Sequence, residues 1–305
     1  MANFQTIMRV RPDYRQFVRH RRLVHRGDAV VVAPNIQTEL FSTDGAGFRH
    51  SVFKGETLAP AEIAARARYG IVLGSSHIFG LGLAGNENTI PSLLGDRFGI
   101  PFANISLPEG NSRNLSSLLT AYIARAPRTP AIVIHFSGGD FTNFSLSSIA
   151  DPVFGSPNLK QLEMVIEERG GRPNPQTQIK ALLAFTSLWT RTIVEQCRAF
   201  AIPILLGHDT TFFEKSEPND LERECALGIP FNAVQAKWFG THRAFFPDFL
   251  TRRETLAQKL KVPLIGPDHS NWLTFIDEMH YDQDGMIAWA DQMAGAVEPL
   301  LQPRT

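Results

Sequence analysis

The sequence predicts a three-layer α/β/α protein whose central sheet holds five parallel strands. From residue 69 onward, short apolar runs alternate with longer segments of helical periodicity. Most apolar runs are entered through Gly or Pro, and polar loop residues follow each of them. Such alternation with short connections is typical of a parallel sheet that helices cover on both faces. The number of strands favours a flavodoxin-like, doubly wound sheet.

The expected elements follow one another along the second part of the chain. Strands are expected at 70–74, 101–106, 131–136, 202–207 and 263–266. Helices are expected at about 89–98, 111–126, 177–200, 246–261 and 284–301. Pro91 suits the first turn of its helix, and Asp284 is expected to cap the last helix.

Residues 1–66 do not show this rhythm, and we expect them to form an N-terminal extension packed on the main domain, residues 67–305. Within the extension, residues 29–33 predict a short strand and residues 43–49 are rich in turn formers. Arginines crowd its beginning: Arg9, Arg11, Arg15, Arg19, Arg21, Arg22 and Arg26. Such a run is typical of a solvated surface, with an anionic ligand or a membrane surface as the alternative partner.

Two intervals are too long to be simple connections between neighbouring elements. Residues 138–176 follow the third expected strand, and residues 208–245 follow the fourth. We expect both to be insertions that emerge at the carboxyl edge of the sheet. Because long loops at that edge commonly shape substrate pockets, these intervals are expected to lie over the functional site.

Composition limits the classes of function. The chain has 305 residues, of which 43% are hydrophobic, so it can bury a large core. Its 30 basic and 30 acidic residues cancel, which removes the general electrostatic argument for nucleic acid as a partner. The first residues lack a secretory pattern, and no segment approaches about 18 continuous apolar residues. With Cys197 and Cys225 as its cysteines, the chain is expected to be cytoplasmic, without disulfides or a membrane span.

The segment from Tyr69 to Gly80 carries the most informative pattern. An apolar run breaks at Gly74 into two serines and a histidine. A buried strand of this kind delivers the next residues to the carboxyl edge of a parallel sheet, where open α/β folds place their chemistry. Ser76 is therefore a candidate nucleophile, with Ser75 as its rival.

Far downstream, Asp277 and His280 lie three residues apart, close enough for the aspartate to orient the histidine. Serine, histidine and aspartate are the parts of an activated-hydroxyl acyl-transfer site. In this hypothesis His280 takes the proton of Ser76 as general base, and Asp277 stabilises the resulting imidazolium. Acyl transfer of this kind needs no Lewis acid, so no metal and no cofactor is expected.

Four short blocks, in order over residues 69–301, resemble the SGNH (GDSL-type) hydrolase superfamily. Its first block, Gly-Asp-Ser, is matched by residues 74–76 with Ser75 in place of the aspartate. The second-block glycine is matched by Gly110. The last block, Asp-x-x-His, is matched fully by Asp277 and His280.

The third block of the family, Gly-x-Asn-Asp, is partly present. If Asp140 is aligned with the family aspartate, Gly139 takes the place of the asparagine that donates to the oxyanion. The resemblance then implies an oxyanion hole built from the backbone N–H groups of Ser76 and Gly110. The third donor is expected to be Asn143 or the Gly139 backbone, with loss of the donor as the remaining alternative. If the Gly139 backbone is the donor, Gly139→Asn is expected to restore the family pattern.

The resemblance implies a serine esterase or O-acyltransferase acting on a small acyl ester. Residues 41–49 also resemble segments that precede the first block in relatives linked to polysaccharide modification, which favours an acyl group on a carbohydrate. The altered first and third blocks leave a second hypothesis open, a catalytically weakened member that binds a glycan or a partner protein.

Other patterns predict different sites. Residues 80–85 satisfy the Gly-x-Gly-x-x-Gly of dinucleotide-binding proteins, but they begin well after the apolar run ends and no helix follows directly. The pairs 208–209 and 268–269, each a His and an Asp, follow the fourth and fifth strands and are the alternative metal ligands. Residues 74–78 lack the second glycine of the α/β-hydrolase elbow. The SGNH-like interpretation accounts for more of the chain than any of these.

Overall fold

A parallel sheet forms the centre of the computed structural model, which describes residues 7, 12–26, 29–157, 161–209, 211–215, 217–227, 233–266, 274–277 and 279–302. In spatial order its strands are β6 (Phe102–Ser106), β5 (Gly70–Gly74), β7 (Ile132–Phe136), β8 (Ile204–Gly207) and β9 (Leu264–Ile265). Every neighbouring pair in it is parallel. This is the strand order of flavodoxin-like, doubly wound sheets. The predicted fold class is confirmed, and each strand lies within two residues of its expected range.

The strands are apolar throughout because both faces of the sheet are covered. All residues of β5, β6 and β7 are buried. Alternate side chains enter two separate cores, with Val72 and Ile134 on one face and Ile71 and Val133 on the other. Continuous apolar runs, rather than alternating ones, are what a doubly covered parallel sheet requires.

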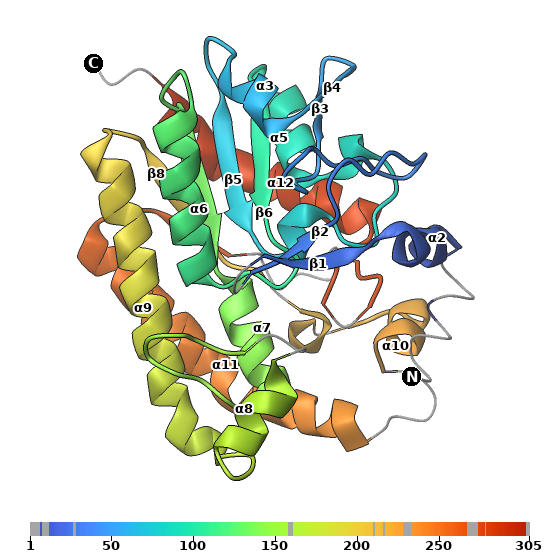
Figure 1. Ribbon diagram of the computed structural model, residues 1–305, viewed down its shortest axis with the longest axis vertical. Helices are drawn as coiled ribbons and strands as arrows, with labels where there is room; N and C mark the ends of the chain where they lie inside the picture. The colour runs from blue at the N-terminus through green and yellow to red at the C-terminus, as the bar shows by residue number, and fades with distance from the viewer. Residues whose placement is uncertain are drawn as a thin grey trace.

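Helices form a layer on each face of the sheet (Figure 1). On one face, α5 (Ile90–Phe98) packs beside α12 (Gln283–Leu301). On the other face lie α3 (Pro60–Ala64), α6 (Ser112–Arg125), α9 (Pro175–Ala199) and the end of α11 (Ala233–Leu260). The three-layer arrangement expected from the sequence is thus present.

Two helix starts differ from expectation. Asp282, not Asp284, caps α12, because the chain is still extended at Asp282 and its side chain accepts the Gly285 N–H at 3.0 Å. Asp284 lies inside the first turn instead. Helix α11 begins at Ala233, well before its expected start at about residue 246, and runs through Pro247.

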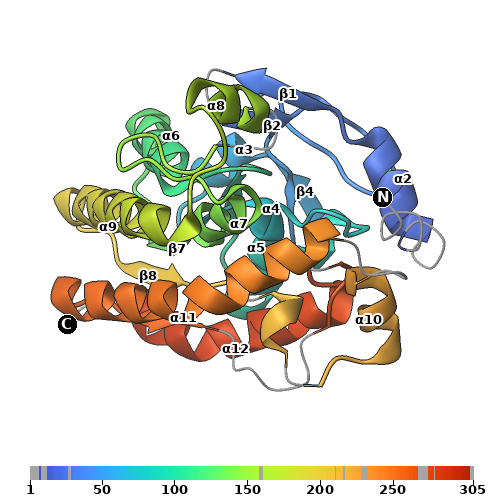
Figure 2. The same cartoon turned by 90° about the horizontal axis from the view of Figure 1, so that it is seen from below.

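The two long intervals contain helices as well as loops. Between β7 and α9 lie α7 (Gly138–Ser147) and α8 (Leu162–Glu168). Between β8 and α11 lie the 3-10 helix η2 (Phe212–Glu214) and α10 (Asp220–Leu227). An aromatic cluster joins α7 to α11 through Phe141, Phe144, Phe245, Phe246 and Phe249. Figure 2 shows α7, α8, α10 and α11 gathered on the side seen from below.

In its described residues, the N-terminal region contains α2 (Pro12–His20) and two antiparallel strand pairs, β1 (Leu23–Arg26) with β2 (Ala29–Val32) and β3 (Ser51–Phe53) with β4 (Glu56–Leu58). The strand expected at 29–33 is confirmed as β2. Phe17 and Phe41 of this region pack against Phe79 and Leu81, which follow β5. The N-terminal region therefore contacts the loop beside Ser76.

None of the helices in the described ranges combines the length and the hydrophobicity that a membrane span needs. Cys197 and Cys225 are both free thiols and both buried.

Candidate active site

Ser76 lies two residues after the end of β5, at the first position of the short helix α4 (Ser76–Phe79). Ser75 is the N-cap residue, and Gly80 ends the helix in the left-handed conformation with a φ of 75°. Glycine suits that position because residues with a Cβ rarely adopt it. The first amides of a helix have no acceptor within it, so α4 presents both the hydroxyl and the N–H of Ser76 at the carboxyl edge of the sheet.

The structure brings Ser76, His280 and Asp277 together. Ser76 Oγ lies 2.8 Å from His280 Nε2, although the two residues are 204 positions apart. His280 Nδ1 lies 2.9 Å and 2.8 Å from the two carboxylate oxygens of Asp277. The imidazole is thus bonded to a hydroxyl at one nitrogen and to a carboxylate at the other, which is the geometry of an acyl-transfer triad.

Asp277 is buried but richly hydrogen-bonded. Its Oδ1 accepts the backbone N–H groups of Met279 and His280 at 2.8 Å and 2.7 Å, and Tyr14 donates to its Oδ2 at 3.3 Å. Burial alone would raise the pKa of Asp277, but the charge of His280 and these hydrogen bonds outweigh it, so the pKa lies below its usual value. The carboxylate therefore stays ionised and holds the Nδ1–H tautomer of His280.

Residues 274–277 and 279–282 form the two arms of a narrow, hairpin-like segment that carries Asp277 and His280. Phe275 and Tyr281 form an antiparallel bridge. The Ile276 N–H donates to the His280 carbonyl at 2.7 Å, which closes the loop just below the candidate triad. The hydrogen bonds within this segment therefore help to hold Asp277 and His280 at a fixed spacing.

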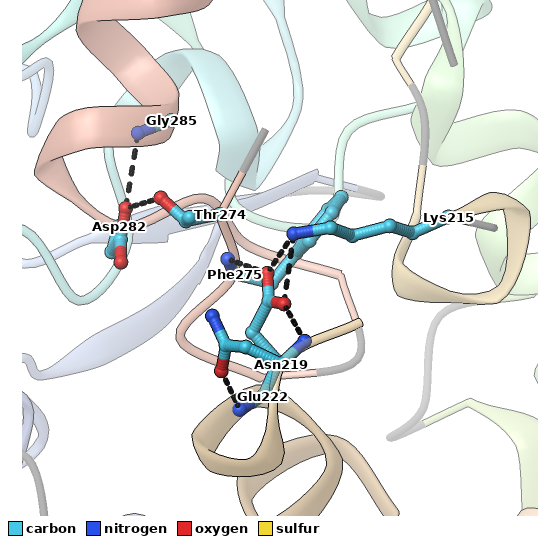
Figure 3. A network of polar contacts seen from close by, with 7 residues as sticks. All are labelled: Lys215, Asn219, Glu222, Thr274, Phe275, Asp282 and Gly285. Carbon is cyan, nitrogen blue, oxygen red and sulfur yellow. Dashed lines mark hydrogen bonds and ion pairs between the residues drawn. The ribbon is translucent and has the colours of Figure 1, made fainter. Parts of the chain in front are cut away.

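Side chains from two helices hold the ends of this loop (Figure 3). Glu222, in the first turn of α10, accepts the Phe275 N–H at 3.1 Å. Its carboxylate also receives Lys215 Nζ at 2.8 Å in a pair whose side chains are 4% and 0% exposed. At the other end, Asp282 accepts the Thr274 hydroxyl as well as the first-turn amide of α12.

The expected oxyanion residues lie beside Ser75 and Ser76. An ideal Cβ on Gly139 would fall 2.1 Å from the Gly110 carbonyl oxygen and 3.1 Å from Ser75 Cβ, so the three backbones are in close approach. The expectation that Gly139→Asn would restore the family pattern is therefore wrong, since the backbone leaves no room for a Cβ. The Gly110 N–H donates to the Leu107 carbonyl at 3.0 Å, within its own turn.

Asn143 lies one turn after Gly139 on the same face of α7 and is 7% exposed. Gly139 itself is in the first turn of α7, where N–H groups lack intrahelical acceptors. The start of α7 therefore points backbone amides, and the positive end of its dipole, toward the edge that holds Ser76.

Asp140, in the segment that matches the third block, binds the start of α6, which follows the second-block glycine Gly110. Its carboxylate accepts the backbone N–H of Ser112 at 2.8 Å and the Ser112 hydroxyl at 2.6 Å. Burial raises the pKa of Asp140, while the Ser112 hydrogen bonds oppose the shift. By holding the start of α6, Asp140 fixes the position of the preceding loop with Gly110.

A buried arginine organises the loop after α4. Arg49 donates to the carbonyls of Gly80, Leu83 and Gly85 at 2.6–2.9 Å, and aromatic rings of Phe17, Phe41 and Phe79 surround it at 5.6–5.9 Å. Residues 80–85 thus turn their carbonyls toward a cation, and the next α-helix begins only at Ile90. A dinucleotide site needs amides at a helix start there, so that alternative is not supported.

The alternative metal ligands do not form a visible cluster. Within the described ranges, no group of three or more His, Cys, Asp or Glu side chains is arranged to hold an ion. Asp209 lies 3.8 Å from His77, and the rings of Phe246 and Phe249 lie against His208. Asp268 and His269 lie outside the described residues.

A cleft of about 300 Å³ adjoins the Gly110 loop. Glu109 and Asn111, the neighbours of Gly110, line it together with Arg113, Asp151 and Arg169. The Arg113 guanidinium lies 5.4 Å from the ring centre of Phe154, whose side chain is 65% exposed at the cleft. Both the α7–α8 interval and the start of α6 therefore contribute to this polar cleft.

Several residues of the site were not singled out by the sequence. Asn219 and Glu222 have the spacing of a capping box, a signal for the start of α10 but not for its contact with Phe275. His77 follows Ser76 directly, yet its sequence position does not reveal that its ring faces Asp209. Tyr14 and Arg49 carry no local signal for their contacts.

No protein-family model matches the chain, and neither does any curated protein. Among solved structures, the chain is similar to a carbohydrate acetylesterase family member from Sinorhizobium meliloti, with 12% identity, coverage of 77% and 99% of the two chains, and a TM-score of 0.46. A lipase from Streptomyces rimosus gives 11% identity, coverage of 75% and 100%, and a TM-score of 0.48. A protein described as a lipolytic member of the G-D-S-L family from Desulfitobacterium hafniense gives 17% identity, coverage of 75% of this chain and 98% of that chain, and a TM-score of 0.43.

Proposed function

We propose that this chain is a serine-dependent ester hydrolase or O-acyltransferase of the SGNH type, with Ser76 as nucleophile. One observation carries the proposal: the unbroken chain of contacts from Ser76 Oγ through His280 to the buried carboxylate of Asp277. These groups come from opposite ends of the sequence, and a serine hydroxyl is a weak nucleophile until a base is placed beside it.

In the proposed reaction, Ser76 Oγ attacks the ester carbonyl while its proton passes to His280 Nε2. The tetrahedral intermediate collapses when His280 returns this proton to the departing alcohol, which leaves the acyl group on Ser76. Water, or the hydroxyl of an acceptor, then attacks the acyl-enzyme and gives its proton to His280. The bond between the acyl group and Ser76 Oγ breaks as His280 passes that proton to Oγ, which restores the serine. Asp277 stabilises the imidazolium in both steps.

The negative oxygen of the intermediate needs donors that are fixed in advance. The N–H groups of Ser76 and Gly139 suit this role because both lie in the first turns of helices. Asn143 adds a side-chain amide on the Gly139 face of α7. Gly110 can join only by sharing its N–H with the Leu107 carbonyl, so we assign it a secondary part.

The cleft beside Gly110 favours a polar alcohol portion of the ester, such as a carbohydrate. Its lining is rich in side chains that hydrogen-bond to hydroxyls, and exposed Phe154 offers a flat apolar face. An acyl group on Ser76 would thus leave the alcohol on the side of Glu109 and Asn111. The alternative, a protein that binds a glycan or a partner protein without catalysis, uses the same cleft and is favoured by the altered first and third blocks, Ser75 in place of the family aspartate and Gly139 in place of the family asparagine.

Covalent labelling with a fluorophosphonate, read by intact mass and peptide mapping, tests the proposal. We expect one adduct, on Ser76, in the wild type and no adduct in Ser76→Ala. His280→Ala should still form the adduct, but at a much reduced rate. Ser75→Ala is the matched control and should still label. Wild-type protein that neither labels nor hydrolyses p-nitrophenyl acetate would reject the enzyme hypothesis in favour of the binding alternative.

A further inference from the structure

Two buried titratable side chains lie next to the proposed triad but do not belong to it. His77, in α4, is 2% exposed, and Asp209, just after β8, is 3% exposed. His77 Nδ1 lies 3.8 Å from Asp209 Oδ2. Within the described part of the chain, that nitrogen and both carboxyl oxygens have no hydrogen-bond partner. Buried polar groups are rarely left so, and the position of this pair beside the proposed triad therefore calls for an explanation.

The other nitrogen of His77 contacts the carbonyl oxygen of Met279. Because a carbonyl only accepts, His77 Nε2 must carry the hydrogen, and Nδ1 must present a lone pair to Asp209. His77 follows Ser76, and Met279 precedes His280. The hydrogen bond between His77 and Met279 therefore joins α4 to the loop of His280, in addition to the contact between Ser76 and His280. The His77 and His280 rings lie 5.2 Å apart.

We propose that His77 and Asp209 form a second histidine–carboxyl pair, which positions His280 against Ser76 through the Met279 carbonyl. The inference rests on the proposed function. In this pair a protonated Asp209 faces the lone pair of His77 Nδ1 across 3.8 Å and so favours the Nε2–H tautomer that binds Met279. His77 is a positioning residue, since it does not touch the reacting atoms.

Electrostatics support a neutral pair. Burial, followed by the charge of His280, lowers the pKa of His77 to about 3, so a second imidazolium does not form beside His280. Burial raises the pKa of Asp209 to about 7, with Arg253 of α11 opposing the shift and Glu214 of η2 adding to it. Asp277 and Met279 act on His77 in the opposite direction to burial. As pH rises through 7, Asp209 ionises and loses the proton that faces His77.

The test compares His77→Leu, which removes the donor to Met279, with His77→Gln, which keeps an N–H on a side chain of similar reach. We expect His77→Leu to lower kcat per labelled Ser76 by about 10²-fold with KM little changed, since misplacing a catalytic group has effects of that order. His77→Gln should recover most of the loss. Asp209→Asn, whose amide keeps its hydrogens at every pH, should abolish the alkaline decline of kcat that ionised Asp209 causes in the wild type.

Titrating active sites with fluorophosphonate normalises each rate to folded protein, so a loss of stability alone does not mimic the effect. Equal kcat in His77→Leu and wild type would overturn the inference, as would an unchanged pH profile in Asp209→Asn. If His77→Leu does not fold, Asp209→Leu removes the same tautomer control, and full activity in that variant would count equally against it. Failure of the wild type to label at Ser76 would instead reject the proposed function.

Discussion

Each side chain of the proposed triad is fixed by contacts beyond its catalytic neighbour. Asp277 is held by two backbone amides and by Tyr14 from the N-terminal region. Ser76 is fixed by its place in α4, two residues after the end of a fully buried strand. Such support restricts the rotamers of reacting groups, and catalytic geometry depends on it.

Replacing Asn143 tests the oxyanion assignment at the level of one side chain. We expect Asn143→Ala to lower kcat by about 10²-fold with little change in KM, because the contact strengthens only as the oxyanion forms. Steady-state kinetics on p-nitrophenyl acetate provide the measurement. Unchanged kcat would contradict the prediction and leave the first-turn amide of Gly139 as the donor that replaces the family asparagine.

At the scale of elements, the loop 274–282 is a preassembled unit clamped between α10 and α12. The clamp on α10 is a buried ion pair, Lys215 with Glu222, whose carboxylate also accepts the amides of Asn219 and Phe275. Since every oxygen lone pair has a use, the pair fixes geometry rather than merely adding attraction.

Breaking this clamp should affect both stability and catalysis. Glu222→Gln removes the carboxylate that lies 2.8 Å from the buried Lys215 ammonium, so we expect a loss of about 3–5 kcal/mol in the free energy of unfolding measured in urea. The hydrogen bond from the Phe275 N–H to residue 222 should also weaken, and the less firmly held loop should reduce kcat per labelled site. Asp220→Asn, which alters a fully exposed carboxylate of the same helix, should change stability by less than about 0.5 kcal/mol. Equal effects of the two variants would contradict the proposed clamp.

Across the whole molecule, buried titratable groups at the carboxyl edge make stability depend on pH. His135 in β7 is fully buried, and both ring nitrogens lack a hydrogen-bond partner within the described residues. Burial, followed by the charge of Arg253, lowers the pKa of His135 from 6.5 to about 3. Between these values the unfolded chain binds a proton that the folded chain does not, so the stability contribution grows as pH rises.

Urea unfolding between pH 4 and 6 checks this expectation. His135→Leu should reduce the rise of stability with pH by about 1.4 kcal/mol per pH unit, the equivalent of one proton. The contribution of Asp209 to the pH dependence of stability has the opposite sign. Its raised pKa makes the folded chain hold a proton that the unfolded chain has lost. Asp209→Asn should therefore steepen the rise. An unchanged slope in His135→Leu would show that the histidine is already charged in the folded protein.

The sequence by itself determined the layered architecture, because the periodicity of apolar residues is a local property. Apolar runs buried on both faces of a sheet must be continuous, and residues 70–74, 101–106 and 131–136 could be identified on that ground. The same runs located Ser76 at a strand end, and the short spacing of Asp277 and His280 marked them as a pair. The predicted N-cap of α12, Asp284, lies two residues after the observed one, Asp282. Two aspartates so close together have similar local preference for that position.

Tertiary structure alone decided which distant groups meet. Asp209 beside His77, Glu222 on Phe275 and Arg49 around residues 80–85 join segments whose separation along the chain leaves no periodic trace. It also decided that Gly139 cannot be exchanged for asparagine, because the obstacle is the carbonyl of Gly110 in another loop. Local propensity records what one segment prefers, whereas close approach and buried hydrogen bonds depend on where several segments are packed at once.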